Sequence, residues 1–152
     1  MSEWIKNWFS NFNELEVPIV AQGITYYTVE NFFQAMKTTD LALRKLIAGM
    51  SAASAKKFCG KRNPQFKLRD GWDDIKLDVM LWALRKKFAP GTKDYLRLLQ
   101  TGTEIIVEKN NWHDCYWGSC QCDRCKDLPH LNNLGILLMQ IRLDAMMKEA
   151  AE

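Results

Sequence analysis

The sequence predicts a mainly α-helical, small α+β domain with two or three short strands. Three observations predict it. Segments with helical spacing of apolar residues begin after Thr, Ser or Asn and mostly end at Gly. Signals for extended backbone are confined to two short stretches. Of the 152 residues, 47% are hydrophobic and 26% are charged, which is typical of one compact domain, here residues 1–152.

The first half of the chain predicts a hairpin followed by three helices. Residues 16–27, EVPIVAQGITYY, place β-branched and aromatic residues on both sides of Gln22-Gly23, which favours a hairpin or two short strands. Thr28 is the expected cap of a helix over 29–37. The next two helices, with their expected caps and terminating glycines, are 40–48 (Thr39, Gly49) and 52–59 (Ser51, Gly60).

The second half predicts a long helix, a short one, a strand and a last long helix. Residues 72–88 carry apolar side chains at 72, 75, 79, 83 and 84, which is a helical period with one buried face. Residues 93–101 predict a short helix, and 103–109 a strand because Ile105, Ile106 and Val107 favour extended backbone. Residues 109–131 read as irregular. The last helix, 134–148, has Asn133 as its expected cap and a stripe of Leu134, Leu138, Ile141 and Ala145.

Charge and cysteine content narrow the function classes. Lys plus Arg is 21 and Asp plus Glu is 18, so the net charge of +3 is too low for a protein that coats nucleic acid. No apolar run has the length of a bilayer span, and the N-terminus lacks the apolar region of a signal peptide. We therefore expect a cytoplasmic protein with no membrane partner. In a reducing cytoplasm, five cysteines are thiols or metal ligands rather than disulfides.

Three polar residues of the first predicted helix share one stripe. Glu30, Gln34 and Lys37 are spaced four and then three residues apart. One interpretation is a solvated surface, since acidic residues favour helix N-termini and basic residues C-termini. The other is a site. A carboxylate in the first turn stays ionised and can stabilise a positive charge or position a water, while the lysine binds phosphate or acts as an amine nucleophile.

Several segments, in order, resemble one family. They are WFSNF (8–12), ENFFQAMK (30–37), WDDIKLDVM (72–80), KF (87–88), TG (101–102), HDCYWG (113–118) and NNLGILLMQIR (132–142). Together they resemble the NADAR, or YbiA-like, family of N-glycosidases over Trp8 to Arg142. The resemblance implies a compact, mostly helical fold and cleavage of a bond between a ribosyl carbon and a nitrogen.

The resemblance also implies substrates and site residues. The substrates are phosphoribosylated pyrimidine intermediates of riboflavin synthesis, or ADP-ribose attached to guanine bases, including those in nucleic acid. It implies that the helix carrying Glu30 is the catalytic element. The motif residues carried over are Ser10, Asn11, Glu30, Gln34, Lys37, Trp72, Asp73, Asp114, Trp117, Gly118 and Asn132.

N-glycosidic cleavage builds positive charge on the ribose, which a carboxylate stabilises while a second group handles a proton. Glu30 is the first candidate for the carboxylate. Asp114 is the second, as an acid whose pKa rises among aromatic neighbours or as a loop cap. Lys37 either binds phosphate or forms a Schiff base with opened ribose.

The binding candidates each have a structural alternative. Trp72 and Trp117 either stack on a base or pack in the core. Ser10 and Asn11 either donate hydrogen bonds to the substrate or form a polar turn between two phenylalanines. Gln34, Asp73, Gly118 and Asn132 complete the expected binding set.

Residues 112–125, WHDCYWGSCQCDRC, hold four of the five cysteines. Many family members carry a glycine-rich stretch here and a glycine at the position of His130. A zinc knuckle is excluded because its fourth ligand would be Gly135. Two interpretations remain, which are reduced thiols or a structural zinc ion. The expected zinc ligands are Cys120, Cys122 and Cys125, with either Cys115 or His130.

The sequence thus predicts a hydrolase of N-glycosyl bonds that requires no organic cofactor. Its expected partner is a small phosphorylated ribosyl or ADP-ribosyl substrate, or a related NAD-derived metabolite. The alternative is a module that binds ADP-ribose or a nucleotide without cleaving it. A zinc-dependent nucleic-acid binder is disfavoured by the low net charge and by the failed knuckle pattern.

Overall fold

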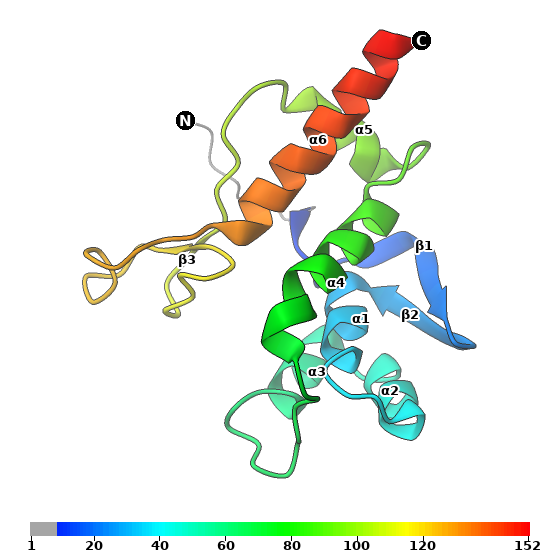
Figure 1. The fold of residues 1–152 in the computed structure, drawn as a ribbon, viewed down its shortest axis with the longest axis vertical. Helices are drawn as coiled ribbons and strands as arrows, with labels where there is room; N and C mark the ends of the chain where they lie inside the picture. Colours follow the sequence, from blue (N-terminus) through cyan, green and yellow to red (C-terminus); the bar gives the residue numbers. More distant parts are fainter. Residues whose placement is uncertain (1–8) are drawn as a thin grey trace. The chain divides into compact units, whose positions relative to one another are not determined.

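The computed structural model describes residues 9–152, which form two compact units (Figure 1). The N-terminal unit is Ser10–Lys87, and the C-terminal unit is Phe88–Glu152 together with Phe9. Six helices and four short strands lie in this described range, which confirms the small α+β class. None of these helices is long and apolar enough to cross a bilayer. One domain over residues 1–152 stays a prediction.

The predicted hairpin opens the N-terminal unit. Strands β1 (Glu14–Ala21) and β2 (Ile24–Thr28) pair antiparallel. Between them, Gln22 and Gly23 have φ of 52° and 74°. Positive φ at both central residues gives a turn whose twist matches that of the flanking strands. The Gln-Gly pair therefore closes the hairpin as the sequence predicts.

Three capped helices follow, and one predicted cap is wrong. Thr28 caps α1 and Ser51 caps α3, as predicted. The cap of α2 is Asp40 rather than Thr39, because the Asp40 carboxylate accepts hydrogen bonds from the Ala42 and Leu43 amides. The helix bounds are α1 (Val29–Ala35), α2 (Leu41–Ala48), α3 (Ala52–Phe58) and α4 (Trp72–Lys87).

Aromatic side chains of α1 and α4 join the core of the N-terminal unit. Phe32 packs edge-on against Tyr26 and stacks on Trp82, with ring centroids 5.4 and 5.0 Å away. Phe33 packs against Trp72 at 5.1 Å. These contacts anchor α1 by its apolar residues. The buried face of α4 is close to the predicted one and contains Trp72, Met80, Ala83, Leu84 and Lys87.

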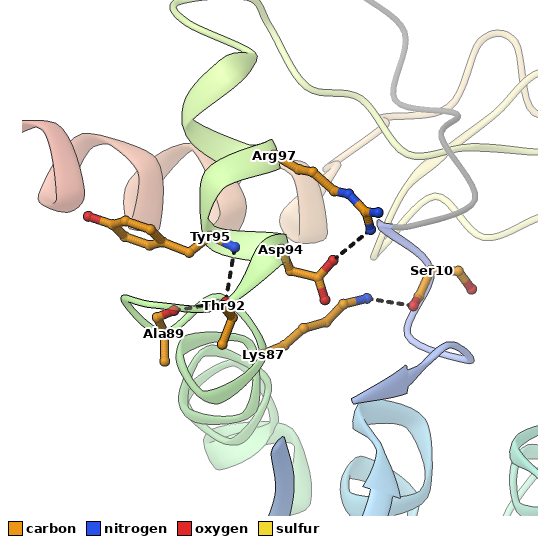
Figure 2. Close-up of polar contacts among 7 residues, drawn as sticks. All are labelled: Ser10, Lys87, Ala89, Thr92, Asp94, Tyr95 and Arg97. Carbon is orange, nitrogen blue, oxygen red and sulfur yellow. Dashed lines mark hydrogen bonds and ion pairs between the residues drawn. The ribbon is translucent and has the colours of Figure 1, made fainter. Parts of the chain in front are cut away.

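The C-terminal unit is built around its last helix. It contains α5 (Lys93–Gln100), β3 (Lys109–Asn110), β4 (Ser119–Cys120) and α6 (Asn133–Ala151). Thr92 caps α5 by accepting a hydrogen bond from the Tyr95 amide at 3.1 Å (Figure 2). Arg142 of α6 donates to the Thr101 hydroxyl just after α5 at 2.8 Å. The predicted stripe of Leu134, Leu138, Ile141 and Ala145 is buried, as expected.

Two predictions for the C-terminal unit are wrong. Residues 103–107 form no strand, although β-branched residues dominate their centre, and Lys109 is the one residue of the predicted strand that lies in β3. The Asn132 side chain instead occupies the place of a partner strand, since it accepts from the Glu108 amide and donates to the Ile106 carbonyl, both at 2.9 Å. The cap of α6 is Asn132 rather than Asn133, with φ of 48° and no side-chain capping bond.

Candidate functional site

Helix α1 buries a carboxylate and an amide that the sequence placed on one stripe. Glu30 is 7% exposed and Gln34 is 3% exposed. The Gln34 amide donates a hydrogen bond from Nε2 to Oε1 of Glu30 at 2.8 Å. The interpretation of this stripe as a solvated surface is therefore wrong for these two residues. Burying a carboxyl group costs free energy even where a hydrogen bond offsets part of that cost, so the position of Glu30 makes it a candidate functional residue.

The Asn11 turn lies against the start of α1. The Asn11 carbonyl accepts the Glu30 amide hydrogen bond at 3.0 Å. Oδ1 of Asn11 and Oε1 of Gln34 are buried acceptors without a hydrogen-bond partner among residues 9–152. An unsatisfied buried acceptor costs about 1–3 kcal/mol. A ligand that donates from hydroxyl or N–H groups would offset this cost.

Lys37 lies just beyond the end of α1, since the helix ends at Ala35 rather than at the predicted residue 37. Its side chain is half-buried, and its Nζ lies 5.7 Å from the centre of the Phe33 ring. Burial lowers the pKa of Lys37, while the neighbouring Cys59 and Glu30 oppose that shift. We call Asn11, Glu30, Gln34 and Lys37 the Glu30 cluster.

Other cations surround Lys37. Lys56 of α3 and Lys76 of α4 both act on Lys37 electrostatically and favour its neutral form. Arg69 donates its backbone amide to the Lys37 carbonyl at 2.8 Å, and its Nε is a buried donor without a partner in the described structure. Positive charge gathered from several elements suits an anionic ligand. Arg69 is not recognisable as a site residue from the sequence, because the loop before α4 carries no periodic signal.

The Cys59 thiol is also close to the Glu30 cluster. Burial raises its pKa to about 11, with an opposing effect of Lys37. A thiol with this pKa stays protonated near neutral pH and is a poor nucleophile. The amine of Lys37 and the carboxylate of Glu30 therefore stay the candidate reactive groups of this cluster.

Lys87 supports the turn that carries two of the predicted binding residues. It is 3% exposed and donates from Nζ to the Ser10 carbonyl at 2.7 Å (Figure 2). The Ser10 hydroxyl accepts the Phe12 amide at 3.2 Å, as expected of a polar turn. Lys87 was not among the predicted site residues, although its place four residues after Ala83 continues the buried face of α4.

The two predicted binding residues at the start of α4 differ in their surroundings. Trp72 is 5% exposed and packs on Phe33, which matches its core-packing alternative. Asp73 is exposed and forms an ion pair with Lys76 at 2.9 Å. The structure thus accounts for Trp72 by packing and places Asp73 beside one of the cations near Lys37.

The remaining predicted residues belong to the C-terminal unit. Asp114 accepts hydrogen bonds through Oδ1 from the backbone amides of Tyr116 and Trp117, at 3.1 and 2.9 Å. This is the loop-capping role that was its alternative. The Trp117 ring packs edge-on against Tyr116 with centroids 4.9 Å apart. Asp114 therefore shapes the turn that presents Trp117.

Gly118 and Asn132 hold that turn against the segment before β3. A Cβ at Gly118 would overlap the carbonyl oxygen of Glu108 and lie 3.0 Å from Nδ2 of Asn110. The Asn132 amide nitrogen donates to the Gly118 carbonyl at 3.2 Å. Since both side-chain polar atoms of Asn132 bind backbone, Gly118 and Asn132 have structural roles that their sequence context does not indicate.

Replacing Gly118 by alanine is expected to lower the free energy of unfolding by about 1–3 kcal/mol, the usual cost of overpacking. The reason is that the obstructing atom belongs to the Glu108 backbone and has little freedom to shift. Urea denaturation of the variant measures the effect. Gly49→Ala is the control, because its Cβ would meet the nearest atom at 3.6 Å. Equal unfolding midpoints for the two variants would contradict this account.

The cysteine loop contains a group that could hold a metal ion. Its members are His113, Cys120, Cys122 and Cys125, whose ligand atoms all lie within 4.8 Å of one another. Three of them are predicted ligands. The fourth differs from the prediction, since neither Cys115 nor His130 belongs to this group.

Comparison with known proteins places the chain in a family. The NADAR domain model matches residues 1–145. The chain is 37% identical over 134 residues to the N-glycosidase YbiA of Shigella flexneri, covering 88% of this chain and 78% of that protein. It is 36% identical over 140 residues to the N-glycosidase Npun_R5314 of Nostoc punctiforme, covering 88% and 82%.

A longer relative and a solved structure agree with this placement. The chain is 32% identical over 125 residues to the riboflavin biosynthesis protein VVA0006 of Vibrio vulnificus, covering 82% of this chain and 32% of that protein. It matches the NMR structure of Escherichia coli YbiA with a TM-score of 0.80 and 30% identity, covering 99% of this chain and 88% of that one. The chain therefore belongs to the NADAR domain family.

Proposed function

We propose that the chain cleaves the bond between C1 of a ribosyl group and a nitrogen in a phosphorylated substrate. Its relatives are named N-glycosidases, and the chain is accordingly a hydrolase acting on N-glycosyl bonds. The observation that carries the proposal for this site is the burial of Glu30 within electrostatic range of Lys37. A carboxylate and an amine enclosed together are suited to reaction at a cationic sugar carbon.

Glu30 is the proposed catalytic carboxylate. When the base departs, positive charge develops on C1 and the ring oxygen of the ribose, and a nearby carboxylate stabilises it. The hydrogen bond from Gln34 holds one oxygen of Glu30 in place at 2.8 Å. Glu30 then accepts a proton from the attacking water. The unpartnered acceptors of Asn11 and Gln34 are the proposed partners of the ribose hydroxyls.

Lys37 has two proposed roles that lead to different chemistry. Its lowered pKa increases the neutral fraction, and a neutral amine can attack C1 of the ribosyl group as the C1–nitrogen bond to the base breaks. The released base takes the proton of the amine, the ribose ring opens to a Schiff base on Lys37, and water hydrolyses it to free the sugar and the lysine. As an ammonium it would bind the substrate phosphate instead. Both roles require the half-buried position that the structure gives it.

The cations around Lys37 support a phosphorylated substrate. Lys56, Lys76 and Arg69 come from α3, α4 and the loop before α4. A phosphate carries close to two negative charges near neutral pH and satisfies several donors at once. The orphaned Nε of Arg69 is the proposed phosphate donor in this group.

The substrate we put first is a phosphoribosylated riboflavin intermediate, since one relative is named a riboflavin biosynthesis protein. An ADP-ribosylated guanine, free or in nucleic acid, offers the same kind of bond and is the second substrate to test. Asp114 stays a proposed proton donor, and Trp117 a proposed stacking surface, on the family resemblance. No organic cofactor enters the proposal. We place the reaction in the cytoplasm, as the thiol-rich composition suggests.

Incubation with both substrates, followed by mass detection of the released base, tests the function. We expect release from the phosphoribosylated intermediate and, on removal of its phosphate, a loss of about 10–100-fold in kcat/KM, the usual worth of charged hydrogen bonds. Release from ADP-ribosylguanosine alone would reassign the substrate. Ligand binding without any release would support the binding module instead.

A further inference from the structure

Four side chains of the cysteine loop converge on one point. The Nδ1 atom of His113 lies 3.3 Å from Sγ of Cys122 and 3.4 Å from Sγ of Cys125. The Sγ atoms of Cys120 and Cys122 are 3.4 Å apart. Cys120 and Cys125 are buried, Cys122 is half-buried and His113 is exposed. We propose that these four residues bind one structural zinc ion.

The spacing of the four atoms fits tetrahedral zinc. With Zn–S bonds of about 2.3 Å and Zn–N bonds of about 2.0 Å, neighbouring ligand atoms lie roughly 3.5–3.8 Å apart. The distances of 3.3 and 3.4 Å are slightly shorter than this range, so a small outward shift of the side chains would admit the ion. A disulfide is ruled out for Cys120 and Cys122 as they stand, because an S–S bond is about 2.05 Å long. Three thiols and one imidazole are a common ligand set for structural zinc.

The backbone around His113 is built to present the imidazole. His113 has φ of 68°, a left-handed conformation that few residues other than glycine adopt. The Asn110 side chain holds this turn, since its Oδ1 accepts the amides of Trp112 and Asp114 and its Nδ2 donates to the Asp114 carbonyl. Asn110 is 3% exposed. A buried residue thus fixes an exposed histidine in an unusual conformation that faces the thiols.

The cysteines are held by separate supports. Cys120 lies in β4, which pairs with β3 through Asn110. His130 binds the Ser119 hydroxyl through Nδ1 and the Cys125 carbonyl through Nε2, both at 2.6 Å. Because both ring nitrogens of His130 are engaged, it positions the loop and is not a ligand. The sequence left Cys115 or His130 open as the fourth ligand, and this proposal puts His113 in that place.

Cys115 is the competing fourth ligand. Its thiol is close enough to Cys125 to form a hydrogen bond, yet it lies outside the group of four. The experiment below therefore includes a variant of Cys115 and a variant of His113, to decide which of the two is the fourth ligand.

Zinc would brace the loop at the place where many family members have glycines. The ligands bracket residues 114–119, whose backbone docks on the start of α6. In that contact, the Cys115 and Trp117 carbonyls accept the Leu131 and Leu134 amides at 2.8 and 2.9 Å. A cross-link of this loop would hold the turn of Trp117 without taking part in bond cleavage. The site stands independently of the proposed function.

Metal analysis of the full chain, purified without chelator and with reductant, tests the site. We expect about one zinc per chain, as in other structural sites. Cys122→Ser and His113→Asn should both reduce the zinc content to near zero. Asparagine tolerates left-handed backbone, so the second variant removes the imidazole without adding strain. Cys115→Ser and Cys59→Ser are the controls that should keep the metal.

A second measurement uses the parental protein alone and therefore does not depend on whether a variant folds. Co²⁺ added to metal-free parental protein should give the visible absorption of tetrahedral, thiolate-bound cobalt, and Zn²⁺ should displace it. Zinc near zero in the parent together with no cobalt spectrum would overturn the site. Full zinc retention in Cys122→Ser or His113→Asn, or its loss in Cys115→Ser, would overturn this ligand set.

Discussion

Glu30→Gln is expected to fold normally and to lose hydrolysis, with kcat about 10²–10⁴-fold below the parent, the usual contribution of a positioned acid or base. Glutamine keeps the size of the side chain and can still meet the Gln34 amide. It lacks the negative charge that stabilises the sugar cation. Base release over time, measured at saturating substrate, gives the effect.

The control for Glu30→Gln is Glu14→Gln, which makes the same chemical change at an exposed position of β1. Its activity should match the parent. The melting temperature of Glu30→Gln should be equal to or above that of the parent, because the variant no longer buries a carboxyl group. Near-parental turnover by Glu30→Gln would defeat the assignment of the catalytic carboxylate.

Two substitutions of Lys37 separate its proposed roles. Lys37→Met should lower kcat/KM by about 10–100-fold if the ammonium binds phosphate, the usual worth of a charged hydrogen bond. In that case Lys37→Arg should recover much of the loss, since it keeps the charge. If Lys37 forms a Schiff base, both variants should lose kcat. Borohydride should then reduce the Schiff base and leave a stable covalent adduct between the parental protein and the sugar. Parental kcat and KM in Lys37→Met would exclude both roles.

The burial of Lys37 also predicts how the free energy of unfolding of the parental protein changes with pH. Burial lowers the pKa of Lys37 below its ordinary value of 10.5, so the folded state holds this proton less tightly than the unfolded state. The cost of burying the ammonium is therefore present below the folded pKa. It disappears as the pH rises to 10.5, and the free energy of unfolding rises across that window.

Lys37→Met should lack this alkaline rise and should be at least as stable as the parent near neutral pH. Chemical denaturation of both proteins at several alkaline pH values measures the difference between them. Subtracting the free energy of unfolding of the variant from that of the parent at each pH cancels the contribution of the other titrating groups. A gap between parent and variant that stays constant with pH would show that Lys37 does not titrate differently on folding.

Local chemistry made most of the fold predictable. The caps at Thr28 and Ser51, the Gln22-Gly23 turn and the apolar stripe of α6 depend on residues close in sequence. Most of the strand expected over 103–109 does not form, because the distant Asn132 side chain takes the hydrogen bonds of the Ile106 carbonyl and the Glu108 amide. Extended propensity alone does not supply a partner strand.

The site was only partly predictable, for the same reason. The spacing of Glu30 and Gln34 predicted a shared stripe, but only tertiary packing decides whether the stripe is buried. His113 escaped prediction as a ligand because Asn110 shapes its turn through side-chain contacts. Arg69 contacts Lys37, and Lys87 contacts Ser10. Both contacts join residues that are far apart in sequence, so no local pattern predicts them.

Counting turnovers is the most direct test of a catalytic site at Glu30. Parental protein is mixed with a large molar excess of the phosphoribosylated intermediate, and the released base is measured against the number of chains. The buried carboxylate and its neighbouring amine predict many equivalents of base per chain, with a much slower yield from Glu30→Gln. Intact substrate, bound tightly to the parent while no base forms, would contradict the assignment and leave a binding protein in its place.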